Sequence, residues 1–451
     1  MVAAEQSVHD IGCAGQCPRL MWNEKSYDST FRAKGVSFDA RVPCIEYCTA
    51  SARTLAISHV WSHGQGGRPS TGINSCLHLR YAEIARRHNC DSYWIDTVCI
   101  PEDHIRRRQA IKEINGIFGT SKVTLVCDRD LMKIDVADLT IQIAESLLVT
   151  LLVCDWNVRA WTLLEAIRGN QGLHLLCSRN QTISLKETLS LVCREGSIDL
   201  AILLLTTEHL LPCVPQPKSL EVAGNLLSHR YATRPGDDIV IWSLLSGTTI
   251  FESAEALWRS RIPGRGSPIK TGYLISSAPR LQDVEYFGWA PSTPVVHSRV
   301  NTHDRAYSSF DGERSEEGQV TPEGLLARWL AHDVSLRDTE AYKGIPWTAK
   351  LQWDEECALW VPQPLPEKPC NSCLHAAKEL HRHYPWVRYL QPLTYLDLKY
   401  YAGAGERGEF HGPVFAICAS KDRKSWEWKG VFEWHVSYSL PVFHEAFVIL
   451  I

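Results

Sequence analysis

The stretch that decides the fold class is SYWIDTVCIPEDHIRRRQAIKEINGIFGTSKVTLVCD, residues 92–128. It opens with an apolar run at 92–100 and closes with a β-branched run at 122–128. Between them, Pro101 and two acidic residues start a segment whose apolar positions recur at helical spacing. A strand, a helix and a second strand in this order are typical of α/β proteins.

The same alternation extends along the chain on both sides of this stretch. Short apolar runs predict further strands, and a Ser-x-x-Glu capping box at Ser184 predicts the start of a helix. We therefore predict an α/β fold with a mostly parallel sheet and helices on both faces. The predicted strands are 55–61, 92–100, 122–128 and 172–177, and the predicted helices are 76–89, 101–118, 137–151, 157–168 and 184–194.

Changes in composition divide the chain into four predicted parts. Residues 1–50 read as an irregular lead-in, and 51–212 as the α/β domain. The region 213–345 is mixed, and its polar stretch 297–323 is predicted to be a mobile loop. Apolar and polar residues alternate in 346–451, which predicts a small antiparallel sheet at the C-terminus.

Composition limits the class of protein. The 451 residues are 45% hydrophobic and 22% charged, as in globular proteins, and the net charge of −4 argues against a nucleic-acid polycation. The N-terminal residues show no secretory signal. The most apolar runs, 147–154 and 200–205, are shorter than the roughly 18–20 residues that span a bilayer. We expect a cytoplasmic protein without a membrane partner.

The cysteine spacing does not predict a metal site. Cys370 and Cys373 form a Cys-x2-Cys pair with His375 nearby, but zinc sites of this type usually join two such pairs. Earlier Cys-x3-Cys pairs would have to reach it across the whole chain. We therefore predict no metal and no required cofactor. The earlier pairs are Cys13/Cys17 and Cys44/Cys48.

Parallel strands deliver their chemistry at one edge. In open α/β sheets, ligands bind beyond the carboxyl ends of the strands. Three predicted strands end with polar or reactive side chains, so we expect these to share one crevice. They are Ser58, His59 and Trp61, then Asp96 and Cys99, then Asp128.

Three segments together resemble the fungal heterokaryon-incompatibility (HET) domain. They are LAISHVWSHG (55–64), YWIDTVCIPEDHIRRRQAIKEINGIF (93–118) and WNVRAWTLLEAI (156–167). RYATRPGDDIVIWSLL (230–245) resembles the Arg…Asp-Asp stretch that often follows this domain. The chain resembles a divergent branch of this family, since His59 stands where the family commonly has an aromatic residue.

The resemblance implies a TIR-like sheet, because HET domains are thought to be similar to TIR-type folds. Some TIR relatives hydrolyse NAD or make nucleotide signals, and many HET proteins trigger cell death. The resemblance therefore implies NAD or a related nucleotide as substrate, protein partners, and a role in immunity.

Glu165 is the first candidate catalytic residue. It follows Trp161 by four residues on one face of a predicted helix. A carboxyl group beside an apolar wall can act as acid or base, or bind a ribose hydroxyl. By the resemblance, TIR-like glycohydrolases rely on a helical Glu. Alternatively, Glu165 pairs with Arg159 and holds a buried turn.

The strand ends supply the other candidate catalytic residues. Asp96 can orient a His or a substrate hydroxyl, or it can cap the backbone of the following loop. Cys99 can act as a nucleophile beside His59, or it can be a buried, inert thiol. The candidate catalytic residues are Glu165, Asp96, His59 and Cys99.

Several segments offer groups for binding a substrate. The glycine-bearing loop 64–72 can present backbone N–H groups to an anion while Arg68 clamps a phosphate, or it can be a plain mobile loop. The run 106–108 can contact nucleotide phosphates or an RNA backbone, or it can form a solvated helix face. Asp237 and Asp238 can hold Mg²⁺ or a guanidinium, or begin a helix. The candidate binding residues are Ser58, Trp61, Arg68, Arg159, Trp161, Asp237 and Asp238.

The sequence is compatible with three functions. The first is a HET-type immunity protein that hydrolyses NAD or a related nucleotide. The second is a biosynthetic enzyme that joins amino acids from aminoacyl-tRNA, such as an arginine-containing cyclodipeptide synthase. The third is a non-catalytic interaction module.

Overall fold

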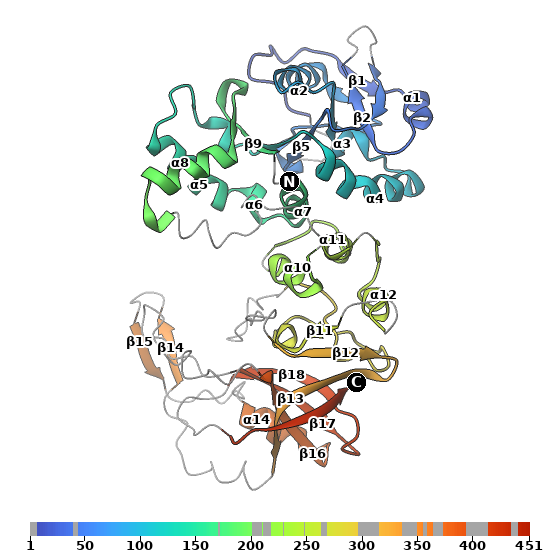
Figure 1. Ribbon diagram of the computed structural model, residues 1–451, viewed down its shortest axis with the longest axis vertical. Coiled ribbons are helices and arrows are strands. Elements are labelled where there is room, and N and C mark those ends of the chain that lie inside the picture. Colours follow the sequence, from blue (N-terminus) through green and yellow to red (C-terminus); the bar gives the residue numbers. More distant parts are fainter. Residues whose placement is uncertain are drawn as a thin grey trace. The chain divides into compact units, whose positions relative to one another are not determined.

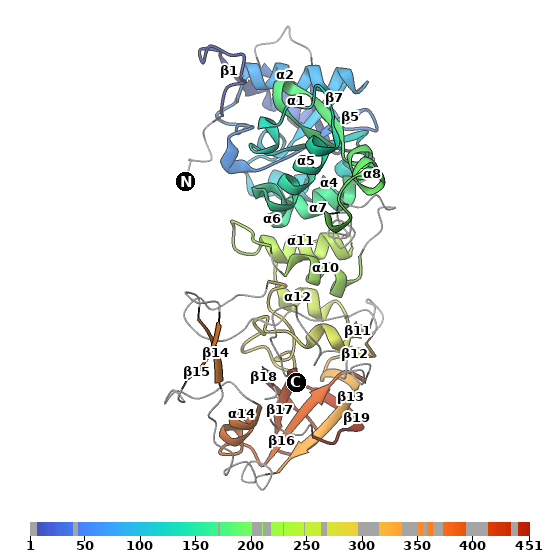
Figure 2. The same cartoon turned by 90° about the vertical axis from the view of Figure 1, so that its left-hand side faces the viewer.

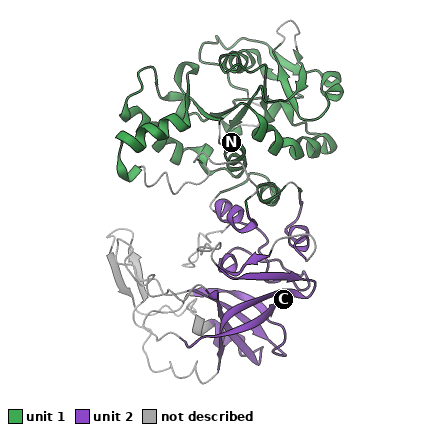
Figure 3. Ribbon diagram, viewed as in Figure 1, with its two compact units in different colours: residues 1–218, 230–250 green, residues 219–229, 251–451 purple. Residues whose placement is uncertain are grey.

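The chain forms two compact units in a computed structural model. Unit 1 comprises residues 1–218 and 230–250, and unit 2 comprises 219–229 and 251–451 (Figure 3). The division therefore differs from the predicted boundaries, because 230–250 joins the α/β part. The described residues are 7–38, 44–169, 172–200, 210, 218–228, 230–247, 249–262, 268–295, 315–335, 350–354, 359–363, 373–393, 414–433 and 441–451.

Unit 1 is built around a sheet whose four central strands are parallel. Their order, β7-β5-β8-β9, places the first of them in the chain between the second and the third. All but one of their residues are buried, as expected for strands covered on both faces. These strands are β5 (Thr54–His59), β7 (Ser92–Ile95), β8 (Val123–Cys127) and β9 (Leu173–Leu176).

Antiparallel strands extend this sheet at both edges. β10 (Thr182–Ser184) pairs with β9, while β2 (Lys34–Ser37) pairs with β7 and with β4 (Tyr47–Thr49). The sheet is therefore mixed rather than mostly parallel. The prediction of an irregular lead-in was also wrong, because two short strands of this region complete the sheet. These strands are too short to show a clear alternation of apolar and polar residues in the sequence.

Helices cover both faces of the sheet. In Figures 1 and 2, α2 lies on one side of β5, and α4 and α7 lie on the other. Apolar residues of α5 and α8 form a core with β8 and β9. The bounds are α2 (Ser75–Arg87), α4 (His104–Thr120), α5 (Ile141–Val153), α6 (Asp155–Val158), α7 (Ala160–Gly169) and α8 (Leu185–Glu195).

The N-terminal part of unit 1 carries a second, small sheet. β1 (Arg19–Trp22) pairs with β3 (Cys44–Ile45) on one side and with β6 (Ile73–Asn74) on the other. Helix α1 (Glu24–Ser29) follows β1, and its Asn23 cap accepts a hydrogen bond from the Ser26 N–H.

The strand predicted at 92–100 is shorter than expected. β7 ends at Ile95, and Asp96–Cys99 form the short helix α3. The carbonyls at the end of α3 find partners away from the sheet: Tyr47 Oη donates to Val98 O at 2.6 Å and Tyr27 Oη donates to Cys99 O at 3.1 Å. These long-range hydrogen bonds satisfy the backbone that a longer strand would pair.

The described residues include one helical stretch, Ile141–Val158, that is long and apolar enough by composition to cross a membrane. Its Leu147, Leu148 and Leu151 are fully buried in the core around α5 and α8. In all, 33% of the stretch is buried, and these leucines contribute to the core of unit 1.

Unit 2 contains helices followed by a curled antiparallel sheet. Its order is β11-β12-β13-β16-β17-β18, with β19 on β13. Helix α14 (Cys373–Leu380) contacts β16, β17 and β18 (Figure 2). The other bounds are α10 (Leu220–Leu227), α12 (Ala254–Arg259), β11 (Ile269–Lys270), β12 (Glu317–Thr321), β13 (Gly324–Val334), β14 (Lys350–Asp354), β15 (Leu359–Gln363), β16 (Trp386–Gln391), β17 (Val414–Ser420), β18 (Glu427–Glu433) and β19 (His444–Leu450).

This sheet begins earlier in the chain than predicted. β11, β12 and β13 come from the region assigned to the mixed middle part. Residues 297–314 of the predicted mobile loop lie outside the described residues, but Glu317–Thr321 form β12, so this end of the loop prediction was wrong. Gly318 and Val320 of that strand are buried, a pattern that polar flanking residues hide in the sequence.

Candidate functional site

Two neighbouring residues at the end of β5 start separate side-chain networks in unit 1. Ser58 donates a hydrogen bond to Glu165 of α7, and Trp156 Nε1 donates to Ser58 Oγ at 2.6 Å. Ser58 and Trp156 are buried, and Glu165 is 6% exposed. The Glu165 carboxyl group therefore lies beside the carboxyl end of β5, where the Ser58 hydroxyl group holds it.

His59 belongs to the second network. Its Nε2 lies 2.8 Å from Asp96 Oδ1, while Trp61 Nε1 donates to Asp96 Oδ2. The Thr97 N–H also donates to Asp96 Oδ1, at 2.6 Å. His59 Nδ1 is buried and has no hydrogen-bond partner among the described residues. Asp96 therefore performs both predicted tasks, since it orients His59 and binds the backbone that follows it.

The two carboxyl groups have opposite electrostatic environments. Burial and the nearby Asp96 charge raise the pKa of Glu165 to about 8, against the opposing effects of Ser58 and Arg159. Burial also favours protonation of Asp96, but His59, Trp61 and the Thr97 N–H outweigh it and lower the pKa of Asp96. At neutral pH, Glu165 is mostly protonated and Asp96 is ionised. Paired groups with separated pKa values are typical of acid–base sites.

Arginine side chains gather around Trp61. The guanidinium carbons of Arg68 and Arg234 lie 4.6 Å and 5.6 Å from the centre of the Trp61 ring. Burial and then the charge of Arg234 lower the pKa of Arg107, and Arg68 adds to the effect. Asp237 and Asp96 offset part of this effect on Arg107, and Glu102 lies 4.0 Å from Arg68. The three guanidinium groups remain close enough to repel one another, an arrangement that an anionic ligand would stabilise.

The segment after residue 229 lies against α6 and α7. The backbone N–H of Ala160 donates to Tyr231 O at 3.0 Å, and Arg159 Nη2 donates to Thr233 Oγ1 at 3.0 Å. Trp161 Nε1 donates to Asp237 Oδ2 at 2.7 Å. These contacts bring Arg234 beside Trp61, although 173 positions separate the two residues in the sequence.

Asp237 and Asp238 begin a helix, as one of the two predictions for them had it. They are the first residues of α11 (Asp237–Ser246), whose N-cap is Gly236 in the left-handed conformation with φ 85°. Acidic side chains in the first turn interact favourably with the positive end of the helix dipole. Because Asp237 also accepts the Trp161 hydrogen bond, its carboxylate is committed to packing within unit 1.

Cys99 lies at a different place from the His59 network. It lines a cavity of about 200 Å³ between α1, β2 and α4, together with Tyr27, Lys34, Trp94 and Arg106. Burial raises the pKa of the Cys99 thiol well above its ordinary range. These observations favour the inert, buried thiol over the predicted nucleophile.

The glycine-bearing loop is packed rather than open. Residues 63–69 are buried, and Tyr81 Oη donates to Gln65 O at 2.6 Å. A Cβ on Gly66 would lie 2.0 Å from Thr97 Oγ1, so close packing explains this glycine. The prediction of a plain mobile loop was wrong, because contacts from α2 and α3 hold it in place.

The basic run at the start of α4 divides its members between two roles. Arg106 bonds to Glu24 and Asp28 of α1, at 2.7 Å to each. Arg107 instead lies within range of Arg68, Arg234 and Asp96. The run therefore contributes Arg107 to the group of arginines around Trp61.

We did not predict Arg234 and Trp156 as members of this site, whereas Arg107 belongs to the run 106–108, for which phosphate contacts were one of the predictions. Arg234 and Trp156 lie within two of the segments that resemble the HET domain, which was the available signal. Cys370 and the side chain of Cys373, the pair that we weighed as a zinc site, lie outside the described part of the structure.

Comparisons with protein-family models, curated proteins and solved structures found no match to this chain.

Proposed function

We propose that unit 1 binds a phosphate-bearing nucleotide at the carboxyl edge of its sheet and hydrolyses the N-glycosidic bond of NAD or a related compound. The observation that carries this proposal is the buried Glu165, whose pKa of about 8 lies near working pH and beside an ionised Asp96. A group with such a pKa exchanges a proton readily at physiological pH. The resemblance to HET domains supports an immunity role for this activity.

The strand order supports the position of the site. Order β7-β5-β8-β9 is that of doubly wound sheets of the flavodoxin-like type, in which the chain reverses direction beside the first strand. Ligands of such sheets bind outside the carboxyl ends at this reversal. Ser58 and His59 end that first strand. This order is also the support for a TIR-like sheet.

Glu165 would act as the general base. Its ionised form takes a proton from water, the water oxygen bonds to ribose C1′, and the bond from C1′ to the nicotinamide nitrogen breaks. Nicotinamide leaves with the electron pair, which neutralises its ring. Because Glu165 is 6% exposed, substrate reaches it only when the side chains around it rearrange.

Arginines would hold the phosphates. Arg68, Arg107 and Arg234 offer charge-assisted hydrogen bonds, and a ligand anion would relieve their mutual repulsion. Trp61 adds an aromatic surface against which a base can stack.

The test is incubation of the purified full chain with NAD, with nicotinamide release followed by chromatography. We expect release by the wild type that increases with pH through about 8, as Glu165 ionises. Glu165→Gln should reduce release at least about 100-fold, the usual contribution of a general base. Glu83→Gln, on the exposed side of α2, is the matched control and should retain activity.

An NAD pool unchanged by the wild type would contradict the proposal, as would full activity of Glu165→Gln. The same arginine and Trp61 group also favours a second candidate, because stacking and phosphate contacts are how proteins hold single-stranded RNA ends. This candidate is transfer of amino acids from aminoacyl-tRNA. A new arginine-containing cyclic dipeptide in an expressing host, with NAD intact, would support it over hydrolysis.

A further inference from the structure

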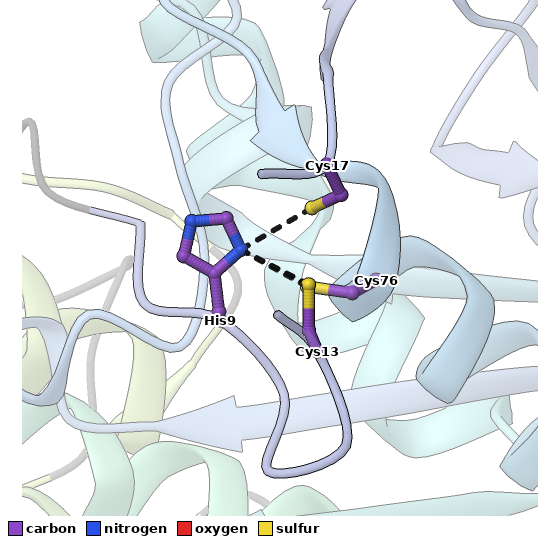
Figure 4. Close-up of side chains that lie close together, drawn as sticks. All are labelled: His9, Cys13, Cys17 and Cys76. Carbon is purple, nitrogen blue, oxygen red and sulfur yellow. Dashed lines mark hydrogen bonds between the residues drawn. The ribbon is translucent and has the colours of Figure 1, made fainter. Parts of the chain in front are cut away.

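Four side chains at the N-terminal edge of unit 1 direct their ligand atoms at one point. His9 Nδ1 lies 3.4 Å from Cys13 Sγ, 3.3 Å from Cys17 Sγ and 3.7 Å from Cys76 Sγ. All four atoms lie within 4.8 Å of one another (Figure 4). Each residue is half-buried, so the group is neither a core packing of thiols nor an open surface.

These separations fit a tetrahedral zinc ion. With Zn–N of about 2.05 Å and Zn–S of about 2.3 Å, the edge of the tetrahedron between nitrogen and sulfur is about 3.6 Å. The observed separations from His9 Nδ1 lie within 0.3 Å of that edge, at 3.3–3.7 Å. One imidazole with three thiolates is a standard structural zinc set.

The chain supplies these ligands from two segments. His9, Cys13 and Cys17 follow one another at intervals of four residues, and Cys76 is the second residue of α2. The Asp10 N–H donates to Cys76 Sγ at 3.2 Å, a hydrogen bond of the kind that supports metal-bound sulfur.

We propose that His9, Cys13, Cys17 and Cys76 bind one structural Zn²⁺ ion. Four protein ligands leave no position for water or substrate, so the ion stabilises structure rather than reacting. This proposal differs from the expectation of no metal. The spacing rule for double Cys-x2-Cys pairs misses the site, because His9 and Cys76 complete a Cys-x3-Cys pair from a distance.

The ion would fasten the N-terminal segment to the first turn of α2, and hydrogen bonds join the same segment to the loop that carries Trp61. The Val8 N–H donates to Gly64 O at 2.8 Å, and Asn74 Nδ2 donates to Ser7 O at 2.8 Å. Arg80 of α2 pairs with Asp10 at 3.4 Å. Without the ion, few apolar contacts hold this segment, since its described residues 7–18 are half-buried or exposed.

The test is the metal content of the purified full-length chain, expressed with added zinc and measured by elemental mass spectrometry. We expect close to one zinc per chain. Cys17→Ser and Cys76→Ser should each lower the zinc content by about tenfold or more, because loss of one ligand opens the site. Cys193→Ser, at an exposed cysteine of α8, is the matched control and should keep its zinc.

A conservative variant makes the result independent of folding defects. His9→Cys converts the set to four thiolates, which also bind zinc, so it should retain the ion, whereas His9→Ala should lose it. X-ray absorption of the wild-type protein should show three sulfur neighbours and one nitrogen. Absence of zinc after loading, zinc retained in both serine variants, or a disulfide among Cys13, Cys17 and Cys76 in protein purified under reducing conditions would overturn the proposal.

Discussion

The Ser58 hydroxyl donates a hydrogen bond to the Glu165 carboxyl group across 107 positions of sequence. The bond joins the end of β5 to the middle of α7, both of them buried. Since Trp156 donates to the same hydroxyl, Ser58 cannot turn away without breaking a second bond. The position of Glu165 is therefore set by the core, which is how a reactive carboxyl group is kept in one orientation.

Stability should depend on pH through Glu165. Its folded pKa of about 8 exceeds the unfolded value near 4.5, so the folded state binds more protons between these values. The free energy of unfolding should therefore fall as pH rises from about 5 to 8, by a few kcal/mol at most. Urea denaturation across this range should show the decline in the wild type and not in Glu165→Gln. Glu83→Gln, at an exposed position of α2, should keep the wild-type decline.

The Asp96 charge should control where this decline occurs. After burial, the charge of Asp96 is what raises the pKa of Glu165, so Asp96→Asn should move the midpoint of the decline to lower pH. The lowered pKa of Asp96 itself contributes stability that is lost as pH falls through that value. Asp96→Asn should therefore lose less stability on acidification than the wild type. A midpoint that does not move would show that burial alone sets the Glu165 pKa.

Two glycines should respond oppositely to the same substitution. Gly66→Ala places a Cβ 2.0 Å from Thr97 Oγ1. We therefore expect overpacking to lower the free energy of unfolding by about 1–3 kcal/mol. Gly116→Ala, in α4, meets nothing within 4 Å and should stabilise by about 0.5–1 kcal/mol. Thermal unfolding of both variants tests this. Equal effects would mean that the loop around Gly66 yields to the added methyl group.

Local patterns predicted most secondary structure of unit 1 and many residues of the site, but not which of these residues contact one another. The capping box is confirmed, because the Glu187 N–H bonds to Ser184 Oγ at 3.3 Å. Asp96 was placed on the correct edge, yet its short helix was missed, because Tyr27 and Tyr47 satisfy that backbone from 50 or more positions away. Arg234 was not predicted either, because only its contact with the distant Trp61 makes it part of the site.

The sequence by itself determined the succession of strands and helices along the chain in the α/β part. It also determined the β-rich character of the C-terminal region and made Glu165 a candidate catalytic residue. These follow from periodicity and side-chain type, which act over a few residues. Only the tertiary structure decided that Glu165 bonds to Ser58, that Arg234 reaches Trp61, and that His9 meets Cys76. Such contacts depend on strand order and on how distant segments pack, and neither leaves a repeating signal along the chain.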